Sequence, residues 1–171
     1  MFVKKTKGRF QGVSIKVTIL ALVLAAVIPS IVFQMLLMFM YVPSDSMSPT
    51  FSSRDTLFGT RIFSSINRGE IVAFQAGDIV MIKRVIGLSG ETVYINETGA
   101  VFVDGNPLDE SYVKNQRSGK SQTFVVPDNC ILLLGDNRAN SFDARYWDNP
   151  YVSVEAVLAI AKYNTLSGRL E

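Results

Sequence analysis

The chain has 171 residues, with 17 Lys and Arg against 15 Asp and Glu and no histidine, a length that accommodates one domain plus an anchor. The missing imidazole excludes a Ser-His-Asp or Cys-His mechanism and any metal site that uses histidine, and no cofactor or metal is expected. Five basic and no acidic residues precede Ser44, so the remainder is mildly acidic and lacks the clustered basic residues that a nucleic-acid partner needs.

A long apolar run follows the basic N-terminus. Residues 1–16 form the basic tail, and residues 17–42 contain no charged side chain. As one helix, interrupted at Pro29, the run measures about 39 Å and crosses a hydrocarbon core of about 30 Å. The basic flank places the N-terminus in the cytoplasm and residues 43–171 outside it. A cleaved secretory signal ending near Ala26 is the alternative, but the run continues for 16 residues beyond that point, which favours an uncleaved anchor in contact with membrane lipid.

The segment after the apolar run contains the candidate nucleophile, Ser46. Pro43 and Pro49 flank three serines, so the segment is neither a helix nor a central strand. This composition favours an extended segment with an exposed hydroxyl at the mouth of a cleft. Linkers after membrane spans have the same composition, and later motifs must decide between the two interpretations.

The rest of the chain is typical of a mainly β protein, a mostly antiparallel sheet or barrel-like domain. Short runs rich in Val, Ile, Phe and Tyr alternate with Gly, Asn, Asp and Pro. The predicted strands are Thr56 to Ile62, Glu70 to Phe74, Ile79 to Leu88, Thr92 to Asn96, Ala100 to Val103, Thr123 to Val126, Cys130 to Leu134 and Val157 to Tyr163.

Two adjacent cations interrupt the third of these strands. Lys83 shares a face with Ile79 and Met81, and Arg84 lies on the other, also apolar, face. One interpretation is a lysine whose stem covers the core while its ammonium reaches solvent. The other is a lysine kept neutral by desolvation, because burial lowers its pKa by up to about 3 to 5 units. Only the second gives a general base.

Two features lie between this strand and the next motif. Asp104-Gly105 separates two short apolar runs and predicts a type I′ hairpin turn, which needs positive φ at both positions. Residues 109–122 are polar and predict a mobile surface loop.

A charged motif directly follows the strand that the single cysteine, Cys130, begins. In residues 135–147, two Asp and two Arg alternate with Asn and Ser. A solvated turn has this composition. Alternatively, the Asp and Arg side chains support the loop by paired hydrogen bonds, while the Ser141 hydroxyl points at the base.

Together these motifs resemble those of the bacterial type I signal peptidases, membrane-anchored serine proteases that remove signal peptides from exported precursors. Four boxes follow the anchor in the family's order, and the resemblance covers nearly the whole chain. They are Pro43 to Thr50, Arg68 to Phe74, Ile82 to Glu91 and Gly135 to Arg145. The departures from the family's pattern are Ser89, Glu91, Ala144 and Asp148.

The resemblance implies a role for each candidate residue. Ser46 would be the nucleophile and Lys83 the general base of a Ser-Lys dyad that acts through an acyl-enzyme. The Ser46 backbone N–H and the Ser44 hydroxyl would form the oxyanion hole, and Ser141 would hold the Lys83 amine. Met47 would line the substrate pocket. The supporting residues would be Asp136, Arg138, Asp143 and Arg145.

The resemblance also implies the partner and the place of action. Signal peptides of exported precursors would be cleaved after small residues at −1 and −3, outside the bacterial cytoplasmic membrane. Three alternatives remain: a processing peptidase dedicated to conjugation or pilus precursors, an anchored peptide-binding domain without activity, and a self-cleaving repressor of the Ser-Lys type. The repressor requires an N-terminal helix-turn-helix where this sequence has an apolar run.

Overall fold

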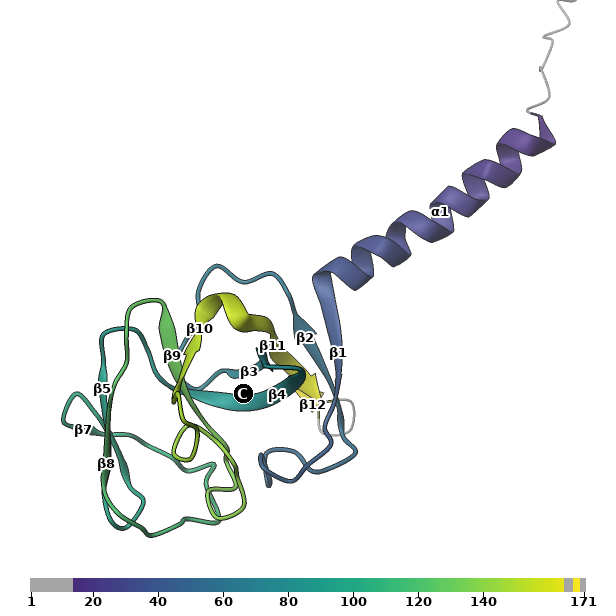
Figure 1. Cartoon of the computed structure of the whole chain (residues 1–171). Helices are drawn as coiled ribbons and strands as arrows, with labels where there is room; N and C mark the ends of the chain where they lie inside the picture. The colour runs from purple at the N-terminus through teal and green to yellow at the C-terminus, as the bar shows by residue number, and fades with distance from the viewer. Residues whose placement is uncertain (1–13, 165–167, 170–171) are drawn as a thin grey trace, which may run out of the picture. The chain divides into compact units, whose positions relative to one another are not determined.

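The computed structural model describes residues 14–164 and 168–169 and divides the chain into two compact units, Met1–Met35 and Leu36–Glu171. Residues 1–13 of the predicted basic tail lie outside the described residues. Helix α1, Ile15–Leu36, has 22 residues and is long and apolar enough to cross a membrane, at about 33 Å. Figure 1 shows it as the purple ribbon at the start of the chain.

The predicted helix is wrong at its C-terminal end. It ends at Leu36, and residues Leu37–Tyr41 form strand β1, which pairs with β2. The rings of Phe39 and Phe58 lie 4.3 Å apart across this pair. Hydropathy alone does not distinguish the end of an apolar helix from a strand that continues it. Ser46 is therefore separated from the helix by a complete strand.

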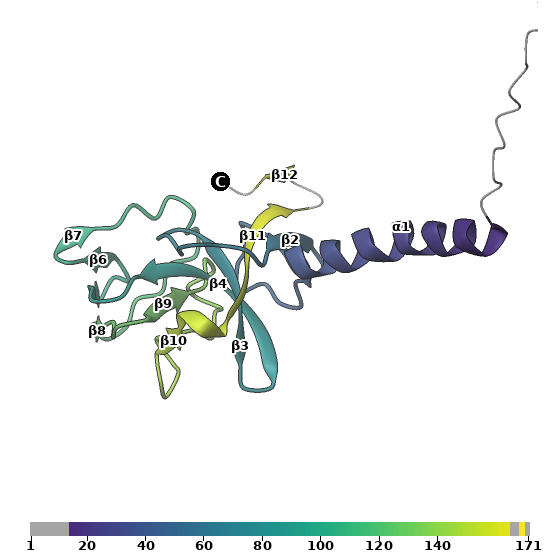
Figure 2. The ribbon, with the colours of Figure 1, turned by 90° about the horizontal axis from the view of Figure 1, so that it is seen from above.

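The second unit contains two antiparallel sheets (Figures 1 and 2). The eight-stranded sheet has the order β1-β2-β11-β3-β4-β9-β10, with β12 paired to β11, and the four-stranded sheet has the order β7-β6-β5-β8. The remaining elements are β2 (Thr56–Thr60), β3 (Ile71–Ala76), β4 (Ile79–Gly87), β5 (Thr92–Ile95), β6 (Val101–Val103), β7 (Asn106–Pro107), β8 (Gln122–Val125), β9 (Cys130–Leu134), β10 (Tyr151–Ser153), the 3₁₀ helix η1 (Val154–Ala156), β11 (Val157–Asn164) and β12 (Gly168–Arg169).

The mainly β fold and all eight predicted strands are confirmed, β9 with the predicted bounds and the other seven with shifted ends. The hairpin turn is confirmed as well, because Asp104 and Gly105 have φ of 48° and 80° between the paired strands β6 and β7. The strands that sequence reasoning missed, apart from β1, are only two or three residues long.

The core of this unit comprises three apolar clusters, of which two lie on opposite faces of β3 in the large sheet. Ala73 of β3 and Leu57 of β2 belong to an apolar cluster that also holds Met47 and Phe51 from the loop after β1. Phe74, one residue further along β3, belongs to a cluster on the opposite face. The cluster with Met47 fixes the loop that carries Ser46.

Candidate active site

The loop that carries Ser46 is a series of turns anchored at both ends. The Arg54 N–H donates to the Val42 carbonyl, and the Val42 N–H donates to the Asp55 carbonyl. Met47 and Phe51 are buried between these ends. The predicted extended segment is therefore wrong, because burying both apolar side chains of so short a segment requires turns. Ser46 itself is half-buried.

Lys83 of β4 lies directly beside Ser46. Its Nζ is 2.6 Å from the Ser46 Oγ, and only 3% of the residue is exposed. No carboxylate lies within ion-pair distance of this amine in the part of the chain that the structure describes. Burial lowers the pKa of Lys83 from 10.5 to about 8, against the opposing charges of Asp143 and Asp136. The amine has the environment of a general base.

Ser44 lies on the exposed side of the same loop. Its hydroxyl donates to the Ser46 hydroxyl at 3.3 Å. The Ser44 hydroxyl therefore lies next to the candidate nucleophile, and its part in an oxyanion hole stays a prediction.

Arg84 carries the other cation of β4 to the opposite side of the strand. Its Nε and Nη2 donate to the two carboxylate oxygens of Asp136 at 2.8 and 2.6 Å. Asp136 is completely buried and also accepts a hydrogen bond from Thr50 in the Ser46 loop. One buried ion pair therefore joins β4, the loop after β9 and the loop of Ser46.

Asn137 holds the Ser46 loop from the other side, and sequence reasoning missed it. Its backbone N–H donates to the Ser46 carbonyl and its side-chain amide to the Asp45 carbonyl, each at 3.0 Å. Gly135, two residues earlier, packs so closely that a Cβ there would overlap the Ser46 carbonyl oxygen and the Ser141 hydroxyl. The loop after β9 thus positions the backbone of Ser46.

Ser141 is buried against Gly135. Its hydroxyl is the only buried side-chain polar atom among the described residues without a hydrogen-bond partner, and Lys83 does not bond to it. The role inferred for Ser141 therefore stays a prediction. An unpaired buried hydroxyl is costly unless it acquires a partner in another state of the site.

Two more buried pairs complete the support. Arg145 donates from Nε and Nη2 to Asp143 at 2.8 and 2.9 Å, and Asp143 accepts from the Gly135 N–H at 3.0 Å. Arg138 donates to the Gly135 carbonyl at 3.0 Å and forms a two-armed ion pair with Glu110. Both pairs converge on the glycine that contacts Ser46.

The segment after β7 is part of this scaffold, so its prediction as a mobile surface loop is wrong where it meets the loop after β9. Glu110 pairs with Arg138, and the ring of Tyr112 lies 4.0 Å below the Arg84 guanidinium. Asn115 accepts a backbone hydrogen bond from Ala139. Sequence reasoning missed Glu110 and Tyr112 because neither belongs to a local motif.

The departures from the expected boxes leave the site intact. Glu91 forms an ion pair with Arg68 at 2.5 Å and accepts the Leu88 N–H at 2.7 Å. Ser89 donates to the Cys130 carbonyl at 3.0 Å. Ala144 is buried in an apolar cluster, where a hydroxyl would need a partner.

A cleft of about 180 Å³ opens beside Ser46 and Lys83. Met47, Val42, Phe51 and Ile82 give it an apolar wall. Its small volume fits short side chains. Met47 lines this cleft, and its role in substrate binding stays a prediction.

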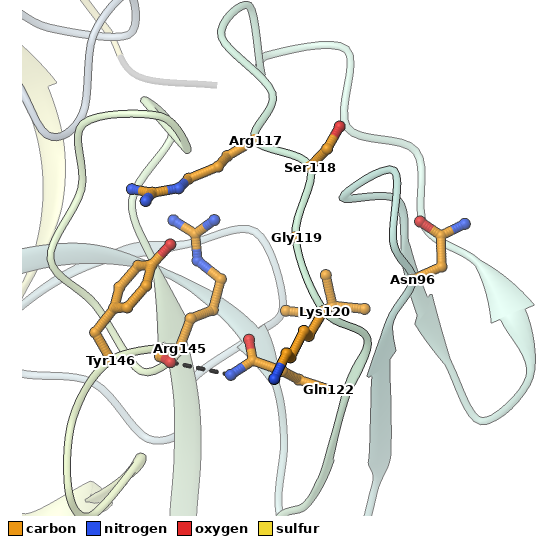
Figure 3. Close-up of a pocket in the computed structure, with 9 residues that line it drawn as sticks. Asn96, Arg117, Ser118, Gly119, Lys120, Gln122, Arg145 and Tyr146 are labelled. Atoms are coloured by element: carbon orange, nitrogen blue, oxygen red, sulfur yellow. Dashed lines mark hydrogen bonds between the residues drawn. The ribbon is translucent and has the colours of Figure 1, made fainter.

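A separate basic cavity of about 390 Å³ lies between the segment after β7 and the loop after β9. Figure 3 shows the guanidinium groups of Arg117 and Arg145 beside the ring of Tyr146, with Lys120 further along. Each guanidinium carbon is 5.3 Å from that ring's centre. Neither Ser46 nor Lys83 lines this cavity, so it is not part of the candidate active site.

Comparison with known proteins gives consistent matches. Residues 14–165 match the model of the family described as signal peptidase, peptidase S26. The chain is 40% identical over 118 residues to the probable signal peptidase I-2 of a Synechocystis strain, covering 63% of this chain and 54% of the relative. It is 33% identical over 144 residues to signal peptidase I S of Bacillus subtilis, covering 76% of each chain.

The matches cover only part of some relatives, and one relative is named inactive. The chain spans 54% to 61% of the length of three matched relatives, two from a Synechocystis strain and one from Leptolyngbya laminosa. A Staphylococcus aureus protein that is 26% identical over 138 residues, covering 74% of this chain and 79% of its own, is named inactive signal peptidase IA. Membership of the family therefore does not by itself establish activity.

Proposed function

The chain belongs to the peptidase S26 family of signal peptidases, and from this premise we propose that it is a membrane-anchored serine endopeptidase that removes signal peptides from exported precursors. The observation that carries the proposal is the 2.6 Å approach of the buried Lys83 amine to the Ser46 hydroxyl. Because the family includes a protein named inactive, the activity of this chain is inferred from this geometry and not from the family alone.

The first step is attack by Ser46 on the carbonyl carbon of the scissile bond. Lys83 takes the hydroxyl proton, which requires a neutral amine. With a pKa of about 8, roughly one lysine in eleven is neutral at pH 7, about 300-fold more than at 10.5. This gain makes a lysine usable as a general base.

The negative charge of the tetrahedral intermediate lies on the former carbonyl oxygen. The Ser46 backbone N–H and the Ser44 hydroxyl donate to it, and one such donor contributes typically about 2.7 to 4 kcal/mol. Lys83 returns the proton to the leaving amine, and an acyl group remains on Ser46. Water, deprotonated by Lys83, then hydrolyses this acyl-enzyme.

Ser141 holds the protonated amine of Lys83 during this cycle. Its hydroxyl has no other partner among the described residues and is therefore free to accept this hydrogen bond. When Lys83 carries the proton it has three N–H donors, and one of them goes to the Ser141 hydroxyl. The contact would hold the amine against Ser46 through both proton transfers. Asp136, Arg138, Asp143 and Arg145 keep the surrounding backbone in place without reacting.

The substrate binds as an extended strand beside β4. Residues 79–83 of β4 pair with β3 on one side, whereas β9 joins the other side only from Arg84 onward. Within the described residues this leaves a free strand edge next to Ser46, and an extended peptide pairs with such an edge. The small cleft accepts the short side chains at −1 and −3.

The proposed location is supported by the N-terminal helix. Residues 1–16 remain in the cytoplasm, residues 17–42 contain the anchor, and residues 43–171 lie outside the bacterial cytoplasmic membrane. Support comes from the 22-residue helix α1 and from the basic residues that precede it. In this arrangement α1 contacts membrane lipid.

The test is cleavage of a purified precursor by the full chain in detergent or vesicles, with the product's N-terminus sequenced. Cleavage after a small residue, abolished in Ser46→Ala and kept in the exposed control Ser64→Ala, supports the proposal. Equal cleavage by Ser46→Ala contradicts it. A chain dedicated to conjugation or pilus precursors would cut only these in a panel of exported precursors.

A further inference from the structure

A second apolar cavity, of about 460 Å³, lies next to the candidate cleft. Its walls come from β3, β4, β10 and the loop after β9. The apolar side chains that define it are Phe74, Met81, Phe142, Trp147, Tyr151 and Val152. No Asp, Glu, Lys or Arg lines it, so it suits an uncharged, apolar group.

This cavity adjoins the cleft of Ser46. Ile79 and Met81 line both. Ile79 is 60% exposed, although it belongs to a strand whose later residues are buried. Large apolar side chains exposed at one place mark a binding surface more often than chance.

Phe142 gives the clearest sign that the cavity receives a ligand. It is 63% exposed, yet its neighbours Ser141 and Asp143 are buried. The loop thus buries its polar residues and presents an aromatic ring to the cavity. Phe142 also packs against Tyr146, with ring centres 6.5 Å apart, so the ring has a support.

The alternation of β4 indicates which part of a substrate meets this cavity. Met81 lies opposite Phe74, and Ile79 lies opposite Ala76, so these side chains share one face of the sheet. Ile82 packs against the cluster with Met47 on the other face, and alternation places Val80 on the face of Ile82. A peptide on the free edge of β4 alternates in the same way. If its −1 and −3 side chains face the Val80 and Ile82 wall of the cleft beside Ser46, its −2 side chain points toward Met81.

We propose that this cavity is a subsite for the −2 residue of the precursor and that it selects a large apolar or aromatic side chain there. The inference rests on the proposed function. The precursor is the occupant because the cavity shares two walls with the cleft and lies along the same strand edge. A charged −2 residue would lose its hydration without gaining a partner.

The experiment compares precursors that differ only at −2, with Phe, Leu, Ala or Glu there and unchanged −1 and −3. The full chain should cleave the Phe precursor with a kcat/KM about 10-fold or more above that of the Ala precursor, as expected for burial of a large apolar side chain. The Glu precursor should be slowest. In Phe142→Ala the ratio between Phe and Ala should fall toward one, whereas the control Tyr94→Ala, on the four-stranded sheet, should retain it.

The failures are distinguishable. Cleavage of all four precursors at equal rates contradicts the subsite and leaves the proposed function standing. Cleavage of none contradicts the proposed function, and the subsite is then judged by binding of the four peptides to Ser46→Ala. Equal affinities there overturn it.

Discussion

Lys83 and Arg84 are consecutive residues of β4, yet only Arg84 has a carboxylate partner. Asp136 binds the Arg84 guanidinium at 2.6 Å, and the Lys83 amine is left with the Ser46 hydroxyl. Had the carboxylate been placed beside Lys83, it would have held the amine in its charged form. The separation of these two cations on opposite faces of one strand makes the base possible.

This arrangement predicts a cost in stability. Between pH 8 and 10.5 an unfolded Lys83 is protonated, whereas the folded one is neutral, so stability rises with pH in this window. Below pH 8 the full penalty applies, on the order of 3 kcal/mol at most for a shift of this size. Lys83→Met should therefore be more stable than the wild type at pH 7 and should lose this advantage as pH approaches 10.5.

Thermal unfolding of the full chain at a series of pH values measures this effect. The control is Lys114→Met, on an exposed residue, which should change the melting temperature little at any pH. A Lys83→Met variant that is less stable than the wild type at pH 7 would show that the amine is not desolvated.

We expect mutations of Arg84 and Asp136 to have non-additive effects on the free energy of unfolding. Asp136→Asn leaves a buried guanidinium without its counter-charge and should cost about 3 to 5 kcal/mol. Arg84→Met alone should cost a similar amount. The double variant should cost less than the sum of the two, and a double-mutant cycle from chemical unfolding measures the difference. Additive effects would mean that the pair does not act as a unit.

We expect the substitution Gly135→Ala to reduce activity while the protein still folds. A methyl group there meets the Ser46 carbonyl oxygen and the Ser141 hydroxyl, so Gly135→Ala should displace the nucleophile. A misplacement of about 1 Å costs on the order of 100-fold in rate. Gly119→Ala is the matched control, because nothing lies within 4 Å of the added methyl group. Precursor cleavage and a melting curve of each variant are the measurements, and full activity in Gly135→Ala would refute the close packing.

Much of the fold follows from the sequence, because each strand is a short run of apolar and β-branched residues between turn formers. The exceptions have local causes. The end of α1 and the start of β1 form one apolar run, and only the pairing of β1 with β2 separates them. The loop of Ser46 was predicted as extended because the prolines exclude regular structure, but they do not determine how Met47 and Phe51 become buried.

The sequence indicated the residues of the candidate site, but it did not indicate most of the contacts that these residues make. The sequence indicated that the Asp and Arg of residues 135–147 form pairs, and Asp143 with Arg145 does so locally. Asp136 and Arg138 instead pair with Arg84 and Glu110, which lie 52 and 28 residues away in the chain. Such partners are chosen by the tertiary structure, so a single sequence does not reveal them.

We therefore expect Glu110, which lies outside every motif, to act as a positioning residue through Arg138. Glu110→Gln leaves the fully buried Arg138 without a counter-charge and loosens its hold on the Gly135 carbonyl. We expect kcat to fall about 10-fold or more while KM changes little, because the nucleophile is displaced and the cleft is not. The exposed control Glu97→Gln should behave as the wild type. Glu110→Asp, which keeps the charge, should recover part of kcat, and an equal loss in both variants would contradict the role.

The most direct measurement of the Ser-Lys dyad is the rate at which a serine-directed acylating probe labels Ser46, followed by mass spectrometry of the full chain from pH 6 to 10. The account predicts a rate that rises with pH, reaches half its maximum near pH 8 and disappears in Lys83→Met. A rate that does not depend on pH, or that persists in Lys83→Met, would show that Lys83 does not activate Ser46.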